Sequence, residues 1–177
     1  MRFLDWNLVV TAHGGRRHDL VHALRPIVRL RRAGYSEVLI GRTADVEACF
    51  AAIAARTDEI FATEVLARVV PVTRTFMIAS EIEAQLVVET AALLDELAGK
   101  SFHVRVERRG QKGIVQSDRL ERTLGTALVE ALRARVETPR VTFRDPDVIV
   151  AVELIGEVGG VGLVPRPLRE RYPFVRL

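Results

Sequence analysis

The sequence predicts an α+β fold built from two consecutive units, and three observations lead to this prediction. Apolar, strand-like segments alternate with amphipathic helical segments through residues 1–73. A second series of strands, grouped around one long amphipathic helix, fills residues 100–164. The chain has 177 residues, of which 49% are hydrophobic and 28% charged, so it is long and apolar enough to bury a core.

The first unit is predicted over residues 1–73. Its expected elements are strands at residues 4–11, 38–40 and 65–72 and helices at residues 18–32 and 45–55. Pro26 suggests that the first helix is kinked or shorter, and Asp45 is placed to cap the second helix. This βαβαβ order predicts a small helix-on-sheet unit of the ferredoxin-like kind.

The second unit is predicted over residues 74–177, with the boundary near Arg74 inside a polar junction at residues 73–80. Its expected elements are helices at residues 80–98 and 117–135 and strands at residues 101–109, 141–143, 148–155 and 161–164. The strand at 148–155 is the most apolar, so we expect it to be central and covered on both faces. Pro165 and Pro167 are expected to end the regular structure and leave residues 166–177 as a basic tail.

Basic charge gathers in the second half of the chain, and nearly all of it is arginine. Residues 1–99 hold 11 Lys and Arg against 13 Asp and Glu, whereas residues 100–177 hold 15 against 10. The planar fork of arginine matches phosphate, so this distribution favours a nucleic acid as partner, although ordinary solvated faces would give the same counts. With no membrane-spanning run and no signal peptide in the sequence, we expect a cytoplasmic protein. The lone Cys49 excludes an internal disulfide and a cysteine-based zinc site.

Five segments of the second unit occur in an order that is typical of one family. They are residues 102–109 with alternating arginines, residues 117–122, the pair Leu124-Gly125, residues 141–147 and residues 150–154. Together these segments resemble a THUMP domain. Phe143 stands in place of the usual leucine, and Asp145 in place of the usual asparagine. The resemblance implies an RNA-binding domain.

The resemblance extends to the stand-alone THUMP adaptor proteins of tRNA cytidine acetylation. It is carried there by residues 6–11, 69–72, 156–162 and 168–172. Those proteins combine a ferredoxin-like unit with a THUMP domain and carry no catalytic domain. The resemblance therefore implies a protein that is not an enzyme, needs no cofactor and binds the acceptor stem and 3′ end of tRNA. It would present that tRNA in trans to a separate modification enzyme, such as the cytidine acetyltransferase.

The first unit departs from the family in one respect. The family usually has a further strand before its second helix, and residues 36–43 are too short for two strands. We therefore expect a trimmed N-terminal unit. Because few aromatic side chains are expected at the surface, we also expect the RNA to be read chiefly by shape and backbone.

The candidate RNA contacts of the second unit are basic side chains that the predicted elements bring together. They are Arg105, Arg108, Arg109, Lys112, Arg119, Arg122 and Arg144. Arg105 and Arg109 share one strand face, and Arg119 and Arg122 lie in the first helical turns, where unpaired backbone N–H groups favour phosphate. The alternative is a set of solvated residues paired with acidic neighbours such as Glu107, Asp118 and Glu121.

The loop at residues 13–18, His-Gly-Gly-Arg-Arg-His, supplies two more candidates, Arg16 and Arg17. Its glycines would let backbone N–H groups approach a phosphate, but a simple strand-to-helix turn has the same composition.

The histidines of this region leave a different class of function open. His13, His18 and His22 leave a small metal-dependent or phosphate-acting enzyme as an alternative, although we assign no metal site. An RNA-free protein-interaction module is the other alternative. We interpret Asp145-Pro146-Asp147 as a turn and not as a metal site.

Overall fold

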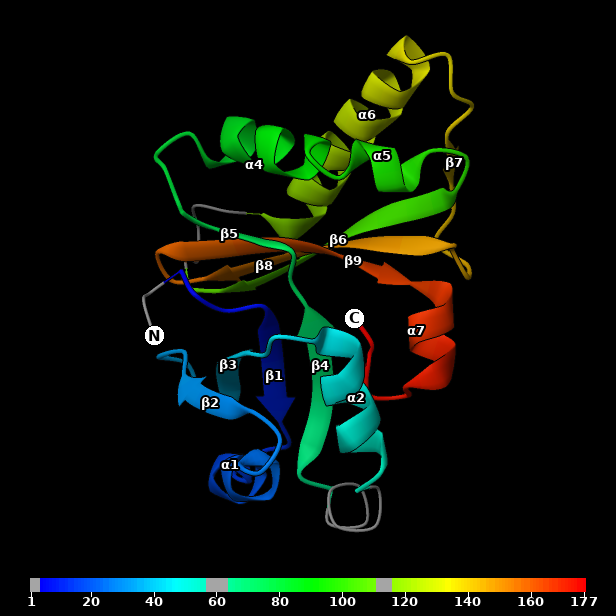
Figure 1. Ribbon diagram of the computed structural model, residues 1–177. Helices are drawn as coiled ribbons and strands as arrows, with labels where there is room; N and C mark the ends of the chain where they lie inside the picture. Colours follow the sequence, from blue (N-terminus) through cyan, green and yellow to red (C-terminus); the bar gives the residue numbers. More distant parts are fainter. Residues whose placement is uncertain (1–3, 57–63, 111–115) are drawn as a thin grey trace.

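The computed structural model describes residues 4–56, 64–110 and 116–177, and it shows an α+β protein with two sheets (Figure 1). The first sheet lies beneath the second, and helices α4, α5 and α6 lie over the opposite face of the second sheet. The second sheet is therefore a central layer with a different neighbour on each face. The α+β fold class predicted from the sequence is confirmed.

The first sheet is antiparallel and has the strand order β2-β3-β1-β4. Its strands are β1 (Leu8–Ala12), β2 (Arg29–Arg32), β3 (Val38–Arg42) and β4 (Leu66–Pro71), and its helices are α1 (Arg17–Leu24) and α2 (Val46–Ala54). Asp45 caps α2, as predicted, by accepting a hydrogen bond from the Ala48 backbone N–H at 3.0 Å. Cys49 is buried in this core, and burial, aided by the charge of Asp45, raises the pKa of its thiol.

The expectation of one helix over residues 18–32 is wrong. Helix α1 ends at Leu24, and Arg29–Arg32 form strand β2 against β3, with Arg31 opposite Ile40. Pro26 lies between the two elements, where its missing N–H and its ring are incompatible with a continuing helix. Strand β2 also corrects the expectation of a trimmed unit, because it supplies a further strand before α2. The order of elements is β-α-β-β-α-β.

The second sheet has the order β5-β9-β8-β6-β7 and is mixed, since β6 runs parallel to β7 and β8. Its strands are β5 (Arg74–Met77), β6 (Ser101–Arg109), β7 (Arg140–Val141), β8 (Val148–Ile155) and β9 (Val158–Pro165). All eight residues of β8 are buried, which confirms the prediction of a covered central strand. Ile149 and Ala151 join the core of the first sheet, whereas Val150 and Val152 join the core under the helices.

The helices of the second unit depart from the prediction at two places. They are α4 (Ile82–Ala91), α5 (Leu94–Leu97), α6 (Ser117–Ala134) and α7 (Arg166–Arg171). The helix expected over residues 80–98 is thus divided into α4 and α5. The polar junction expected at residues 73–80 contains strand β5, which pairs with β9 and buries only Phe76. A strand with one buried side chain carries too weak a pattern to be seen in the sequence.

The expected basic tail at residues 166–177 is also wrong. Helix α7 begins directly after Pro165, and Pro167 lies in its first turn, where proline is tolerated. Tyr172, Phe174 and Val175 are then buried in the core of the first sheet. Phe50 of α2 meets the rings of Tyr172 and Phe174 edge to face, with ring centroids 5.7 Å apart in both pairs. The chain thus returns from β9 of the second sheet to the core of the first sheet, and residues 172–175 connect the two units.

Strand β9 packs tightly against the segment that joins the two sheets, and this contact predicts a stability effect. A Cβ atom at Gly162 would lie 2.4 Å from the Pro71 carbonyl oxygen and 2.9 Å from the Val72 Cα. Because both neighbours are backbone, Gly162→Ala is expected to lower the free energy of unfolding by about 1–3 kcal/mol in urea titrations. Gly125→Ala is the control, since nothing lies within 4 Å of a Cβ there and the change should stabilise α6 by about 1 kcal/mol. Equal effects of the two substitutions would contradict this packing.

None of the helices in the described part of the chain is both long enough and apolar enough to cross a membrane.

Candidate nucleic-acid interface

Part of the predicted arginine set lies where the end of β6 meets the beginning of α6. Arg105 projects from β6 with 47% of its side chain exposed, and its guanidinium lies 3.7 Å from Glu107 and 3.5 Å from Glu121. Glu121 is also held in place, since its Oε1 accepts a hydrogen bond from the Val106 backbone N–H at 2.9 Å. The pairing with acidic neighbours that the sequence left open is therefore present at Arg105, although half of this side chain still faces solvent.

A polar hollow of about 330 Å³ lies between these two elements. It is lined by Arg105, Val106, Glu107, Arg108, Gly110, Ser117, Asp118 and Glu121. The N-cap residue of α6, Gln116, makes no side-chain cap hydrogen bond among the described residues, and Ser117 and Asp118 of the first turn line the hollow. The combination of guanidinium groups with a helix N-terminus suits an anionic group such as a phosphate.

Helix α6 adds two exposed arginines on its outer side. Arg119 is 68% exposed and lies 3.3 Å from Glu83 of α4, while Arg122 is exposed one turn further on. We call Arg105, Arg108, Arg119 and Arg122 the arginine edge. Lys112, the remaining candidate of this stretch, lies outside the described residues.

Arg109 lies elsewhere, although the alternating pattern of β6 puts it on the same face as Arg105. Only 12% of its side chain is exposed, and its Nη1 donates to Oε2 of Glu153, which is fully buried in β8. This face of β6 is covered by the first sheet at its far end, where Arg68 of β4 pairs with Glu107 at 3.1 Å. The sequence showed the face of Arg109 but not this cover, so the structure places Arg109 in the interior of the protein.

The pKa values of the two carboxylates in this cluster, Glu153 and Glu107, are shifted in opposite directions. Burial raises the pKa of Glu153, and the charge of Arg109 opposes that rise without cancelling it. Burial also acts to raise the pKa of Glu107, but the hydrogen bond and charge of Arg68, together with Arg109 and Arg105, outweigh it and lower that pKa. Glu153 therefore depends on Arg109 as its charged partner.

In the loop at residues 13–18, before α1, the carboxylate of Glu37 occupies the place that a phosphate was predicted to take. The backbone N–H of Gly15 donates to the Glu37 carboxylate at 3.1 Å. Arg16 pairs with Asp19 at 2.5 Å, and Arg17 is the first residue of α1 and half-buried. The loop is adjacent to the β2–β3 turn, whose Tyr35 lies against Gly110 at the end of β6. The two regions predicted to contact RNA are thus linked through this turn.

The histidines of this loop show no metal-site geometry. The Nε2 of His18 lies 3.3 Å from a guanidinium nitrogen of Arg32. Across residues 4–56, 64–110 and 116–177, no group of three His, Cys, Asp or Glu side chains is placed to hold a metal ion.

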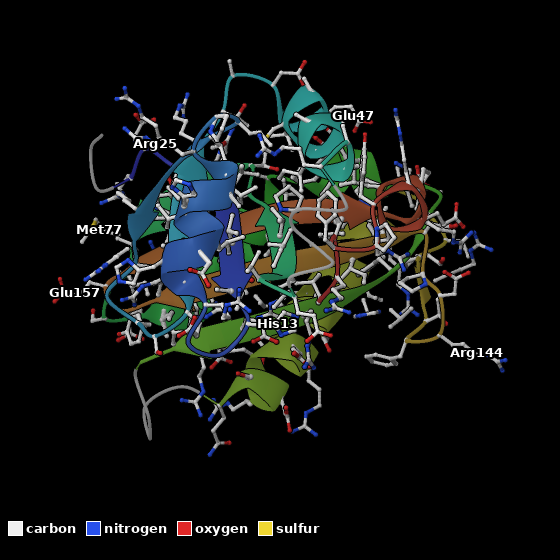
Figure 2. The ribbon with its side chains drawn as sticks, turned by 90° about the horizontal axis from the view of Figure 1, so that it is seen from below. His13, Arg25, Glu47, Met77, Arg144 and Glu157 are labelled. Carbon is white, nitrogen blue, oxygen red and sulfur yellow. The ribbon has the colours of Figure 1, made fainter. Side chains whose placement is uncertain are left out.

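A second and larger groove, of about 530 Å³, runs along the other side of α6. Its walls are α6 and the segment that begins with β7, and its floor is the beginning of β6. Phe143, which stands where the family usually has leucine, lies at the edge of the groove with 78% of its surface exposed. Arg144, the next residue, is exposed, and Figure 2 shows it pointing away from the body of the protein. This groove could not be predicted from the sequence, because its walls come from segments far apart in the chain.

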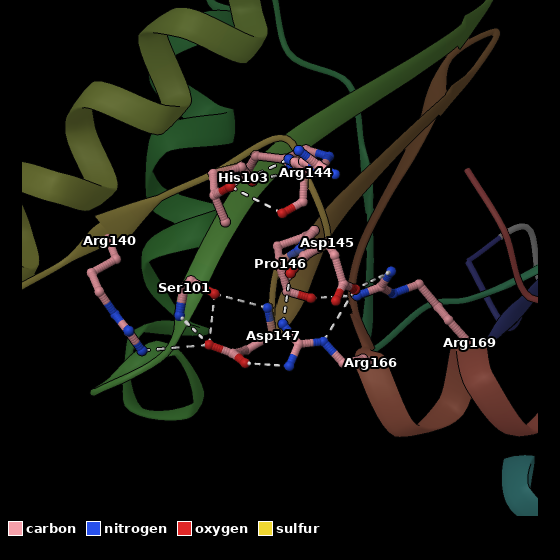
Figure 3. Close-up of polar contacts among 10 residues, drawn as sticks. Ser101, His103, Arg140, Arg144, Asp145, Pro146, Asp147, Arg166 and Arg169 are labelled. Atoms are coloured by element: carbon pink, nitrogen blue, oxygen red, sulfur yellow. Dashed lines mark hydrogen bonds and ion pairs between the residues drawn. The ribbon is translucent and has the colours of Figure 1, made fainter.

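The Asp145-Pro146-Asp147 segment fixes this loop to the sheet (Figure 3). Asp147 Oδ2 accepts hydrogen bonds from the Ser101 backbone N–H at 2.8 Å and from its hydroxyl at 2.6 Å. Arg166 of α7 lies 3.1 Å from both Asp145 and Asp147. The carboxylates of this segment therefore serve protein contacts, in line with the structural interpretation of the motif.

These contacts predict a pH-dependent contribution of Asp147 to stability. The two hydrogen bonds from Ser101, followed by the charges of Arg166 and Arg140, lower the pKa of Asp147. A carboxyl whose folded-state pKa is lowered stabilises the protein above its unfolded value of about 3.9 and loses that contribution as the pH falls through the folded value. Asp147→Asn should therefore lower Tm at pH 7, and the difference from wild type should begin to shrink below about pH 4 and disappear once the pH has fallen below the folded-state pKa. A difference that is the same at both pH values would contradict this role of the charge.

Comparisons with known proteins place these features in a family. Residues 83–164 match the family described as THUMP domain, a segment that contains β6, α6 and both hollows. No curated protein matches the chain in sequence.

Several solved structures are similar in fold. TrmN from Thermus thermophilus has a TM-score of 0.59 and 24% identity, over 95% of this chain and 48% of that one. PH1313 from Pyrococcus horikoshii has a TM-score of 0.55 and 10% identity, over 89% of this chain and 54% of that one. A 4-thiouridine synthetase, solved as an RNA complex with bound ATP, has a TM-score of 0.51 and 15% identity, over 90% of this chain and 41% of that one.

At these identities the likeness shows the fold alone. The chain spans about half the length of these proteins. The family match coincides with the five segments of residues 102–154 that resemble a THUMP domain. Residues 83–164 of this chain therefore form a THUMP domain.

Proposed function

We propose that this protein binds tRNA at its acceptor stem and 3′ end and presents it to a separate tRNA-modifying enzyme. The observation that carries the proposal is the arginine edge, which lies beside a polar hollow within the THUMP domain. Guanidinium groups next to a helix N-terminus fit the phosphates of a folded RNA. Contacts of this kind position the RNA and supply affinity without reading its sequence.

The similar structures support RNA as the partner, and the resemblance to the THUMP adaptor proteins favours tRNA. One of them is a 4-thiouridine synthetase bound to RNA, and another is described as a putative methyltransferase complexed with SAH. This chain aligns with about half of each protein or less, over both of its own sheets. We infer from its β-α-β-β-α-β order that the first unit is ferredoxin-like, and that both units together form the RNA-binding part.

We further propose that the protein acts in trans and has no catalytic role of its own. The partner enzyme that the resemblance favours is the tRNA cytidine acetyltransferase. In this mechanism the arginine edge captures the tRNA by charge, and the bound tRNA is then oriented for the enzyme. A cytoplasmic location is consistent with such a role.

A reconstituted acetylation reaction tests this role. The purified acetyltransferase is given tRNA and its other substrates, with this protein, without it, or with a variant reversed in charge at the arginine edge. N4-acetylcytidine in the tRNA is measured by mass spectrometry. We expect wild-type protein to increase the rate of acetylation and the variant to leave it at the level of the enzyme alone. If wild-type protein binds the tRNA and acetylation does not change, presentation to this enzyme is wrong.

A further inference from the structure

The polar hollow beside the arginine edge contains a carboxylate that would repel a phosphate. Glu107 lines this hollow together with Arg105 and Arg108. Only 25% of its side chain is exposed, so water and salt screen its charge weakly. If Arg105 alone had to neutralise Glu107, that guanidinium would be unavailable to an RNA. A second cation is therefore needed, and the first sheet supplies it.

Arg68 of β4 reaches Glu107 from the first sheet. Its Nη2 lies 3.1 Å from Oε2 of Glu107, and 18% of its side chain is exposed. The ion pair thus joins β4 of the first sheet to β6 of the second, and Figure 1 shows the first of these sheets beneath the other. Because Arg68 is mostly covered by protein, we expect its charge to act on Glu107 and not directly on RNA.

Strand β4 is secured at the position of Arg68. The register of β4 against β1 shifts beside this residue, where Ala67 is an extra residue in the ladder. A bulge of this kind redirects the neighbouring side chain. The C-terminal residues hold the other edge of the strand. Nε of Arg176 donates to the Ala67 carbonyl at 3.0 Å, and the Val69 N–H donates to the Phe174 carbonyl at 2.8 Å.

Arg105 approaches the other oxygen of the Glu107 carboxylate. Its Nε lies 3.7 Å from Oε1 of Glu107, and its Nη1 lies 3.5 Å from Oε1 of Glu121. Both carboxylates have a nearer donor, since Arg68 lies 3.1 Å from Glu107 and the Val106 N–H lies 2.9 Å from Glu121. Arg105 is therefore loosely paired, and a guanidinium in this state can exchange its acidic neighbours for a phosphate.

We propose that Arg68 is a positioning residue of the RNA-binding site, which neutralises Glu107 and thereby leaves Arg105 free to bind an RNA phosphate. Without Arg68, the Glu107 carboxylate would draw the guanidinium of Arg105 inward and would repel the phosphate. The inference rests on the proposed RNA-binding function. It assigns to the first unit a contribution to affinity that requires no contact between Arg68 and the RNA.

Substitutions of Arg68 test this role by fluorescence anisotropy with bulk tRNA. We expect Arg68→Ala to weaken binding about five- to tenfold, and Arg68→Lys, which keeps the cation, to stay within about twofold of wild type. Arg74→Ala is the matched control, because Arg74 pairs with Glu89 at the same distance of 3.1 Å and neither residue lines the hollow. This control removes one positive charge and should change the affinity by less than about twofold.

The same substitution in a Glu107→Gln background separates positioning from direct contact. With no carboxylate to neutralise, loss of Arg68 should change the tRNA affinity of Glu107→Gln by less than about twofold. A direct contact between Arg68 and a phosphate would give the same five- to tenfold loss in both backgrounds. The double variant also keeps the test valid where Arg68→Ala alone is unstable, because neither charge of the pair remains without its partner.

The outcomes distinguish this inference from the proposed function. Equal losses in the two backgrounds, or an Arg68→Ala protein that binds tRNA as wild type does, would overturn the positioning role and leave RNA binding in place. If wild-type protein does not bind tRNA, the proposed function fails and this inference fails with it.

Discussion

Reversing the charge of the arginine edge is expected to weaken tRNA binding by about 100-fold at physiological salt. The variant carries Arg105→Glu, Arg119→Glu and Arg122→Glu, at the three exposed members of the arginine edge, and leaves the half-buried Arg108 unchanged. Each lost phosphate contact retains one more counterion on the RNA, so the slope of log affinity against log salt should also fall by about three. Arg105→Glu adds to the effect, because the new carboxylate faces Glu107 and Glu121 without a cation between them.

A matched control keeps the net charge of that variant and moves the substitutions elsewhere. Arg25, Arg42 and Arg135 are exposed and lie outside both hollows. Their reversal to glutamate should weaken tRNA binding far less than reversal of the arginine edge, although the protein loses the same charge. Filter binding or fluorescence anisotropy at two salt concentrations measures both variants. Equal losses in the two variants would mean that net charge, and not this surface, governs binding.

Arg109→Ala is expected to act on stability and not directly on RNA binding. Its guanidinium is the charged partner of Glu153, whose side chain has no exposed surface. Removing one partner of a buried ion pair typically costs about 3–5 kcal/mol, because a charge stays buried without compensation. We therefore expect the free energy of unfolding to fall by about 3 kcal/mol in denaturant titrations. The tRNA affinity of the protein that remains folded should stay within about twofold of wild type.

A double variant provides the control for Arg109. Replacing Arg109 by Met and Glu153 by Leu removes both charges together, and such exchanges are often neutral or stabilising. The double variant should regain most of the stability that Arg109→Ala loses. A stable Arg109→Ala protein that no longer binds tRNA would show that Arg109 contacts RNA, as its place on the strand face alone predicted.

The parts of the fold that could be predicted are those whose own sequence pattern is long and regular. Strand β6 carries regular alternation, strand β8 an almost continuous apolar run and helix α6 helical periodicity. Their predicted bounds agree with the structure to within a residue or so. Strand β2 could not be predicted, because its four residues, Arg-Leu-Arg-Arg, are held by the hydrogen bonds of β3 and not by a pattern of their own. For such a segment, pairing with a neighbouring strand determines the secondary structure, because its own residues do not favour one conformation.

The candidate site shows the same division. Alternation along β6 identified Arg105 as a residue that faces away from the helices, and this side chain is half exposed. The same alternation could not reveal that the first sheet covers the far end of that face, where only 12% of the Arg109 side chain is exposed. Phe143 was visible only as a departure from the usual leucine, since its exposure and its contact with His103 depend on how the loop folds back onto β6.

The most direct test of the account is the binding of wild-type protein to bulk tRNA, compared with a DNA duplex of matched length, at 50 mM and 200 mM salt (about the range over which counterion release is large). We expect tRNA to bind more tightly than DNA at both concentrations and its affinity to fall steeply as the salt concentration rises. If tRNA does not bind, or binds no better than the DNA duplex, the claim that this THUMP domain holds tRNA is contradicted.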